Sequence, residues 1–291
     1  METASVTYLP ISGRSRLARI APAARTPLRM AKAVVESCVA CGHTRISVTD
    51  AIIPTGEVGH KAGGLGSLLR MSAAEFVPES ADLDGLRKAA DGCKGCHLHE
   101  NATQTVFSKG SVSARLVLVG EQPGDVEDKR GEPFVGPAGK LLDRAVADAG
   151  LDPGHTYTTN AVKHFKFTLA ANGKRRIHAT PDTHEIGACR PWLVAEFALL
   201  DPEVVVALGA TAAKALFGPS FRVTKSRGVL MPWPASAAHA EEFDRGEDEG
   251  SAGAFALATI HPSAVLRAED RDAAYGGLVN DLKIAAKALA G

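Results

Sequence analysis

Short apolar runs alternate with amphipathic stretches from residue 71 to the end of the chain. The runs at 115–120, 156–162, 204–209 and 255–260 predict four buried strands. Apolar side chains at helical spacing predict helices at 80–91, 138–149, 180–200, 211–217 and 272–290. Ser80 and Thr180 are the expected N-caps of the first and third helices, with Pro181 at the first helical position of the latter. Strands that alternate with helices indicate an α/β fold, and we expect three layers around a central four-stranded, mostly parallel sheet.

Two stretches depart from this pattern. Residues 1–70 have poor hydrophobic periodicity, and no acidic residue occurs between positions 3 and 35. We expect a disordered or non-native N-terminal extension, with a transit-like peptide as the alternative, and we place the folded domain at 71–291. The acidic, Ala- and Gly-rich stretch at 235–253 is expected to be a solvated loop.

Composition narrows the class of protein. The 291 residues are 45% hydrophobic and 23% charged, with a net charge of zero, so positive charge for a nucleic acid must be local. No apolar run reaches the roughly 18 residues of a membrane span, so we expect no membrane association. Five cysteines, four of them in two C-x-x-C pairs, indicate a reducing cytoplasmic compartment and metal ligation.

Polar motifs follow three of the predicted strands. They are Gly120-Glu121-Gln122-Pro123-Gly124-Asp125, the single Asn160, and His261-Pro262-Ser263. Because ligands of such sheets bind where parallel strands end, these loops should gather at one edge. Each feature taken alone is as consistent with a turn, a core Phe134 or a structural histidine as with a site.

Together these motifs resemble the uracil-DNA glycosylase superfamily, in its iron–sulfur branch. The resemblance rests on Gly120–Gly124, Glu127-Asp128, the run from Gly131 to Gly139, and His261–Ser263. It implies a base-excision pocket next to Gly120, in which Phe134 stacks on uracil. Asn160 would donate to uracil O4 and accept from N3–H, which cytosine cannot match, and His261 would donate to O2 of the leaving base.

The resemblance also implies a 4Fe-4S cluster. Its ligands would be Cys93, Cys96 and Cys189, with His164 where the branch has a cysteine in an N-x-V-K-C context. Histidine ligation of iron–sulfur centres is known in principle, while three cysteines and a histidine are also a structural zinc set. The pair Cys38 and Cys41 lacks a convincing second pair and receives no role.

The basic stretch at 163–178 is expected to be a mobile loop, and it ends in Lys174-Arg175-Arg176-Ile177-His178. This pentapeptide, with Gln122, resembles the X-type subgroup, in which the loop histidine attacks C1′ of the abasic sugar and stays bonded to it. His178 would be the nucleophile, with Glu121 hydrogen-bonded to it so that the attacking nitrogen stays deprotonated, and with Gln122 and Asp125 lining its pocket. Contacts to DNA are expected from Lys174, Arg175, Arg176 and Ser263. The expected partner is uracil-containing DNA, preferably single-stranded, bound by a monomer.

Two alternatives stay open. One is a turnover glycosylase that releases abasic DNA. The other, from a different class, is a noncatalytic iron–sulfur protein that binds DNA.

Overall fold

The computed structural model describes residues 34–37, 44–47, 71–233 and 254–290. The chain divides into two compact units, Met1–Leu65 and Gly66–Gly291. In the first unit, β1 (Val34–Ser37) and β2 (Thr44–Ser47) pair antiparallel. Cys38, Cys41 and the acidic stretch at 235–253 lie outside the described residues.

The second unit is built on a six-stranded sheet with the order β3-β5-β4-β8-β10-β9. Its centre consists of four parallel strands: β5 (Thr156–Asn160), β4 (Leu116–Gly120), β8 (Val204–Leu208) and β10 (Phe255–Thr259). These are the four strands that the apolar runs predict, so the α/β fold with a mostly parallel sheet is confirmed. Two antiparallel edge strands, β3 (Ser108–Lys109) and β9 (Met231–Pro232), are additional, because two residues are too few to show a period.

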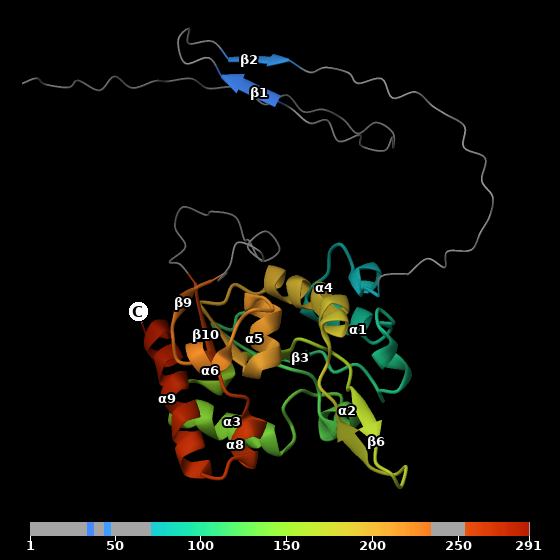
Figure 1. Cartoon of the computed structure of the whole chain (residues 1–291), viewed down its shortest axis with the longest axis vertical. Helices are drawn as coiled ribbons and strands as arrows, with labels where there is room; N and C mark the ends of the chain where they lie inside the picture. The colour runs from blue at the N-terminus through green and yellow to red at the C-terminus, as the bar shows by residue number, and fades with distance from the viewer. Residues whose placement is uncertain (1–33, 38–43, 48–70, 234–253, 291) are drawn as a thin grey trace, which may run out of the picture. The chain divides into compact units, whose positions relative to one another are not determined.

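Helices cover both faces of this sheet. On one face lie α1 (Leu83–Ala90), α4 (Thr183–Leu199) and α5 (Gly209–Phe217). On the other face lie α3 (Pro137–Asp148), α8 (Pro262–Arg267) and α9 (Arg271–Leu289), which stand together in Figure 1. Each face of the sheet has its own hydrophobic core, and alternate residues of β4 contribute to the two cores. Val117 and Val119 pack on the first face, and Leu116 and Leu118 on the second.

Shorter elements connect these layers. They are η1 (Ala74–Phe76), η2 (His97–Glu100), α2 (Asp125–Arg130), η3 (Pro153–His155) and α6 (Val223–Ser226).

Two expected helix caps were wrong. The side chain of Asp82, not Ser80, caps α1 by accepting from Gly85 N at 2.8 Å. Asp182, not Thr180, caps α4 and forms a capping box with Glu185. The box satisfies N–H groups in both directions, so it determines where α4 begins.

The expected loop at 163–178 contains a β-hairpin. β6 (Phe167–Leu169) pairs antiparallel with β7 (Arg176–His178), with Phe167 opposite His178. The hairpin lies beside α2 (Figure 1), and its turn is closed by Ala170 N donating to Arg175 O at 2.8 Å. His178 is therefore carried on a paired strand.

Candidate functional site

A cavity of about 700 Å³ lies at the carboxyl ends of the parallel strands. It collects residues at or just after the ends of β4, β5, β8 and β10, and adds His178 from the hairpin. The predicted site residues that line it are Glu121, Gln122, Phe134, Asn160, His178, His261 and Ser263. Parallel pairing explains the convergence, because Gly120 stands opposite Asn160 and Leu208 opposite Thr259 in register.

Asn160 and Phe134 lie next to each other in the cavity wall. Asn160 is 1% exposed, and its Oδ1 is buried with no hydrogen-bond partner. A Cβ on Gly120 would lie 2.3 Å from this oxygen and 2.5 Å from Cζ of Phe134, so only glycine lets the three groups meet. Phe134 itself has φ of 56°, a left-handed conformation that is costly for a residue with a side chain. A buried acceptor beside an aromatic ring is suited to an N–H donor on a flat ligand.

His261 lies at the junction of β10 and α8. Its Nδ1 accepts from Ser263 N at 3.1 Å and lies 2.8 Å from Ser263 Oγ. Burial, assisted by the charges of Arg267 and His178, lowers the pKa of His261 to about 4. The ring is therefore neutral near pH 7 and carries its proton on Nε2, which makes Nε2 a hydrogen-bond donor.

His178 and Glu121 meet at the same cavity. His178 Nε2 lies 3.3 Å from Glu121 Oε1, and the side chain of His178 is 49% exposed. The other carboxylate oxygen, Oε2, accepts a hydrogen bond from the hydroxyl of Thr211. No motif in the sequence pointed to Thr211, since α5 brings it to Glu121 only in the fold.

Gln122 ties the hairpin to the end of β4. Its Nε2 donates to Lys166 O and to Ala179 O, both at 3.1 Å, and its Oε1 accepts from Lys166 N at 2.9 Å. Lys166 precedes β6 and Ala179 follows β7, so one side chain holds both ends of the hairpin.

Arg176 connects the hairpin to α2. Its guanidinium binds Asp125 Oδ1 and Asp128 Oδ2, each at 2.6 Å, and lies over the ring of Phe167 at 5.0 Å. A hydrogen bond from Lys129, followed by those from Arg176, lowers the pKa of Asp125. These contacts differ from two expectations: Arg176 is committed to carboxylates instead of standing free for a phosphate, and Asp125 is not among the residues that line the cavity.

The other expected DNA contacts are accessible. Lys174 and Arg175 are exposed near the turn of the hairpin, and Ser263 is partly buried at the cavity.

Glu127 is a cavity residue to which the sequence reasoning gave no role. Its Oε1 accepts from Gly136 N at 2.7 Å, and a Cβ on Gly124 would lie 2.6 Å from its Oε2. It therefore joins the start of α2 to the loop that carries Phe134. Its place in the Glu127-Asp128 motif was the available signal.

The three cysteines of the expected cluster lie buried in the core that includes α1 and α4. Two of them have N–H donors directed at sulfur: Trp192 Nε1 lies 3.2 Å from Cys93 Sγ, and Lys163 N lies 3.2 Å from Cys189 Sγ. His164 is also buried, and its Nε2 lies 2.9 Å from Thr105 Oγ1. Burial lowers the pKa of His164 to about 4, so the imidazole is neutral, as a metal ligand must be.

These four side chains are of the types that bind an iron–sulfur cluster or a structural zinc ion. Within the described residues, no group of three or more His, Cys, Asp and Glu side chains is placed to hold one metal ion. Burial raises the pKa of Cys96, and that of Cys189 to about 12, so binding of a metal or cluster here would be coupled to loss of the thiol protons. The N–H groups directed at sulfur are the donors that thiolates require.

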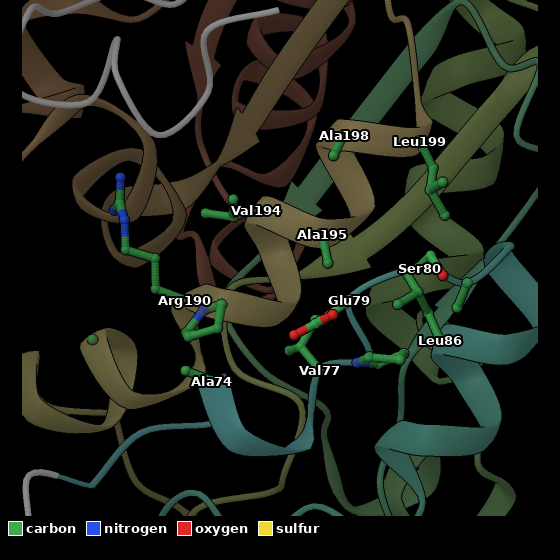
Figure 2. Close-up of a pocket in the computed structure, with 14 residues that line it drawn as sticks. Ala74, Val77, Glu79, Ser80, Leu86, Arg190, Val194, Ala195, Ala198 and Leu199 are labelled. Carbon is green, nitrogen blue, oxygen red and sulfur yellow. The ribbon is translucent and has the colours of Figure 1, made fainter. Parts of the chain in front are cut away.

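A second cavity, of about 890 Å³, lies between α4 and the segment from η1 to α1. Figure 2 shows Val194, Ala195, Ala198 and Leu199 along α4, with Leu86 across the groove. None of the predicted site residues lines it. In the part of the chain that the structure describes, no helix is long and apolar enough to cross a membrane.

The fold and the first cavity define a class: an α/β protein with a cavity lined by polar and aromatic side chains at the ends of its parallel strands. Sequence comparison adds the particular family. Residues 107–283 match the profile of the uracil DNA glycosylase superfamily, and the chain belongs to this superfamily.

Several curated proteins are similar to the chain. A type-4 uracil-DNA glycosylase of Thermotoga maritima is 35% identical over 176 residues, which are 60% of this chain and 78% of that protein. A type-4 enzyme of Pyrobaculum aerophilum is 36% identical over 135 residues, covering 46% and 64% of the two chains. A third, of Sulfurisphaera tokodaii, is 35% identical over 156 residues, covering 52% and 67%.

Proposed function

We propose that the protein excises uracil from DNA and then becomes covalently attached to the abasic sugar through His178. Membership of the superfamily and similarity to type-4 uracil-DNA glycosylases support the excision. The observation that carries the covalent step is the position of His178, which lines the same cavity as Asn160 and faces Glu121 at 3.3 Å.

Recognition of the base uses the two ends of the Asn160 amide. The unpartnered Oδ1 accepts from uracil N3–H, and the NH2 group donates to O4. Cytosine presents the reverse pattern and would leave buried polar groups unpaired, which is the stronger form of discrimination. Phe134 supplies the aromatic face on which the base stacks.

Bond cleavage transfers the electron pair of the glycosidic bond to uracil. His261 donates from Nε2 to O2 as negative charge develops there, and loss of such a donor typically costs about 3 kcal/mol of barrier. Because His261 is already neutral with Nδ1 occupied by Ser263, this donor is preorganised.

Capture follows at C1′. A lone pair on one imidazole nitrogen of His178 forms the new bond, and the ring becomes positively charged. The Glu121 carboxylate faces that ring and stabilises the charge until the remaining ring proton leaves to solvent. Uracil departs, so no good leaving group remains to reverse the bond. Each molecule would act once.

A denaturing gel distinguishes the alternatives. Incubation with a uracil-containing oligonucleotide should give a band of lower mobility that survives heat and SDS, and His178→Ser should abolish it. Alkali-labile abasic DNA without that band would establish an ordinary turnover glycosylase. Absence of uracil release would favour a noncatalytic DNA-binding protein.

We also propose that Cys93, Cys96, His164 and Cys189 hold a 4Fe-4S cluster that stabilises the loops around the site. Absorbance near 400 nm from a brown protein, with about four irons per chain, is the expected result. A colourless, zinc-loaded protein would contradict the proposal.

The remaining expectations are proposals of the same kind. We propose a cytoplasmic monomer that prefers single-stranded DNA, with its catalytic domain at 71–291 and an extension at 1–70. Lys174 and Arg175, exposed near the hairpin turn, are the proposed phosphate contacts. Size-exclusion chromatography and parallel assays on single- and double-stranded oligonucleotides test these points.

A further inference from the structure

Thr211 is a buried polar residue next to the site that does not line the cavity. It lies in the first turn of α5 and is 7% exposed. The cavity wall includes Leu208, Gly209 and Ala210 from this segment, so Thr211 stands behind the wall.

The topology explains how Thr211 reaches Glu121. β4 and β8 are neighbouring parallel strands, with Val119 opposite Ala207, so the residues that follow the two strands meet. α5 begins directly after β8 because Gly209 adopts φ of +89°. A Cβ on Gly209 would lie 2.9 Å from the Cβ of His261, which brings the first turn of α5 against the site.

The hydroxyl of Thr211 donates to Glu121 Oε2. Threonine in a helix commonly donates to a backbone carbonyl of the preceding turn, but here the hydroxyl is directed to a side chain on another element. The β-branched side chain has few rotamers, and a buried position restricts it further. Thr211 is therefore a rigid donor to one oxygen of the carboxylate whose other oxygen faces His178.

The Glu121–His178 contact depends on this arrangement. The backbone of Glu121 is held, because Val162 N donates to Glu121 O at 3.0 Å. Its side chain is 21% exposed and lines the cavity, and the side chain of His178 is half-exposed on the hairpin. The hydroxyl of Thr211 and Nε2 of His178 are the two groups in contact with the carboxylate in the described structure.

We propose that Thr211 is a positioning residue for His178. Its hydroxyl fixes the Glu121 carboxylate in the orientation that keeps Oε1 next to the imidazole. The inference rests on the proposed capture step, and it assigns Thr211 to capture and not to release of uracil.

The test uses the full-length protein and the variants Thr211→Val and Thr211→Ser. Single-turnover assays measure uracil release and adduct formation on the same oligonucleotide. Valine preserves shape and removes the donor, so adduct formation should slow about tenfold or more, the effect of one hydrogen bond to a charged group, while uracil release stays near the wild-type rate. Serine restores the donor and should recover most of the adduct rate.

Thr183→Val is the matched control, since Thr183 is exposed at the start of α4. It should behave as the wild type in both assays. Wild-type adduct formation by Thr211→Val would overturn the proposal. So would equal defects in Thr211→Val and Thr211→Ser, because a purely structural role would not be rescued by the hydroxyl.

A measurement without DNA separates this inference from the proposed function. The ring ¹⁵N shifts of His178 should change in Thr211→Val and return in Thr211→Ser. If the wild type releases uracil without forming an adduct, the capture step fails, and the shifts still test the positioning contact. Unchanged shifts would refute it. Should Thr211→Val fail to fold, Thr211→Ala serves in its place.

Discussion

Gln122→Leu removes the three hydrogen bonds that tie the β6–β7 hairpin to the end of β4. Leucine is of similar size and apolar, so the change removes polar contacts without opening a large space. Gln122 is 7% exposed, and its partners are Lys166 N, Lys166 O and Ala179 O. Two other sets of contacts remain in the variant: the hydrogen bond from Ala179 N to Lys166 O, and the ion pairs of Arg176 with α2. The hairpin should therefore loosen without unfolding.

The magnitude follows from the bonds that are lost. Three neutral hydrogen bonds at a net value of about 1 kcal/mol each amount to about 3 kcal/mol. Because these bonds connect the hairpin to the body, the loss should appear as local opening. A difference of about 3 kcal/mol corresponds to roughly 100-fold in an opening equilibrium, since 1.36 kcal/mol is a factor of ten.

Two assays read this effect. Amide hydrogen exchange over residues 166–179 should accelerate by up to about 100-fold, while exchange in the central strands should stay unchanged. Adduct formation should slow more than uracil release, because only the former needs His178 in place. Gln104→Leu is the control: it makes the same substitution at a glutamine whose side chain donates to Asp128 O at 3.0 Å. Unaltered exchange in the hairpin of Gln122→Leu would refute the view that this side chain holds it.

Three further predictions concern recognition, pH and the buried core. Asn160→Ala removes both hydrogen bonds to the base, so single-turnover uracil release should fall about 10- to 100-fold; an unchanged rate would exclude Asn160 from recognition. His261 binds its proton near pH 4 in the fold and near pH 6.5 when unfolded, so stability should fall by about 3 kcal/mol as pH drops through that window. Denaturant melts of His261→Gln should show a shallower dependence there, and an identical one would contradict the assignment. Lys163→Met leaves Glu196 buried without the ammonium now 2.5 Å away, so the free energy of unfolding should fall by about 3–5 kcal/mol. Adding Glu196→Leu should recover part of the loss, and a single variant within about 1 kcal/mol of wild type in urea would count against a structural pair.

The sequence predicted the parts of the fold that have a clear period. Four apolar runs became the four parallel strands, and Leu83, Leu86 and Ala90 form the buried face of α1 as their spacing indicates. The sequence was less informative about where helices begin. Ser80 and Asp82 are both acceptable N-caps for α1, and only the packed structure selects Asp82. The hairpin escaped prediction because each of its strands has three residues.

Some features of the site could likewise be predicted from the sequence, and others could not. Residues at or near the ends of strands, such as Asn160 and His261, could be placed at the sheet edge from the sequence, since parallel strands end together. The partners of Arg176 could not, because the choice between a phosphate and the carboxylates of α2 depends on which surface the hairpin lies against. Thr211 had no motif at all.

By itself, therefore, the sequence determined the α/β architecture and the sheet edge at which the cavity lies, because hydrophobic period and strand-end position are local properties. Only the tertiary structure decided which side chains meet: Gln122 and Arg176 bind the hairpin to the body, and the Thr211 hydroxyl donates to Glu121. These contacts join residues far apart in the chain, and their geometry depends on packing between elements, which local patterns do not encode.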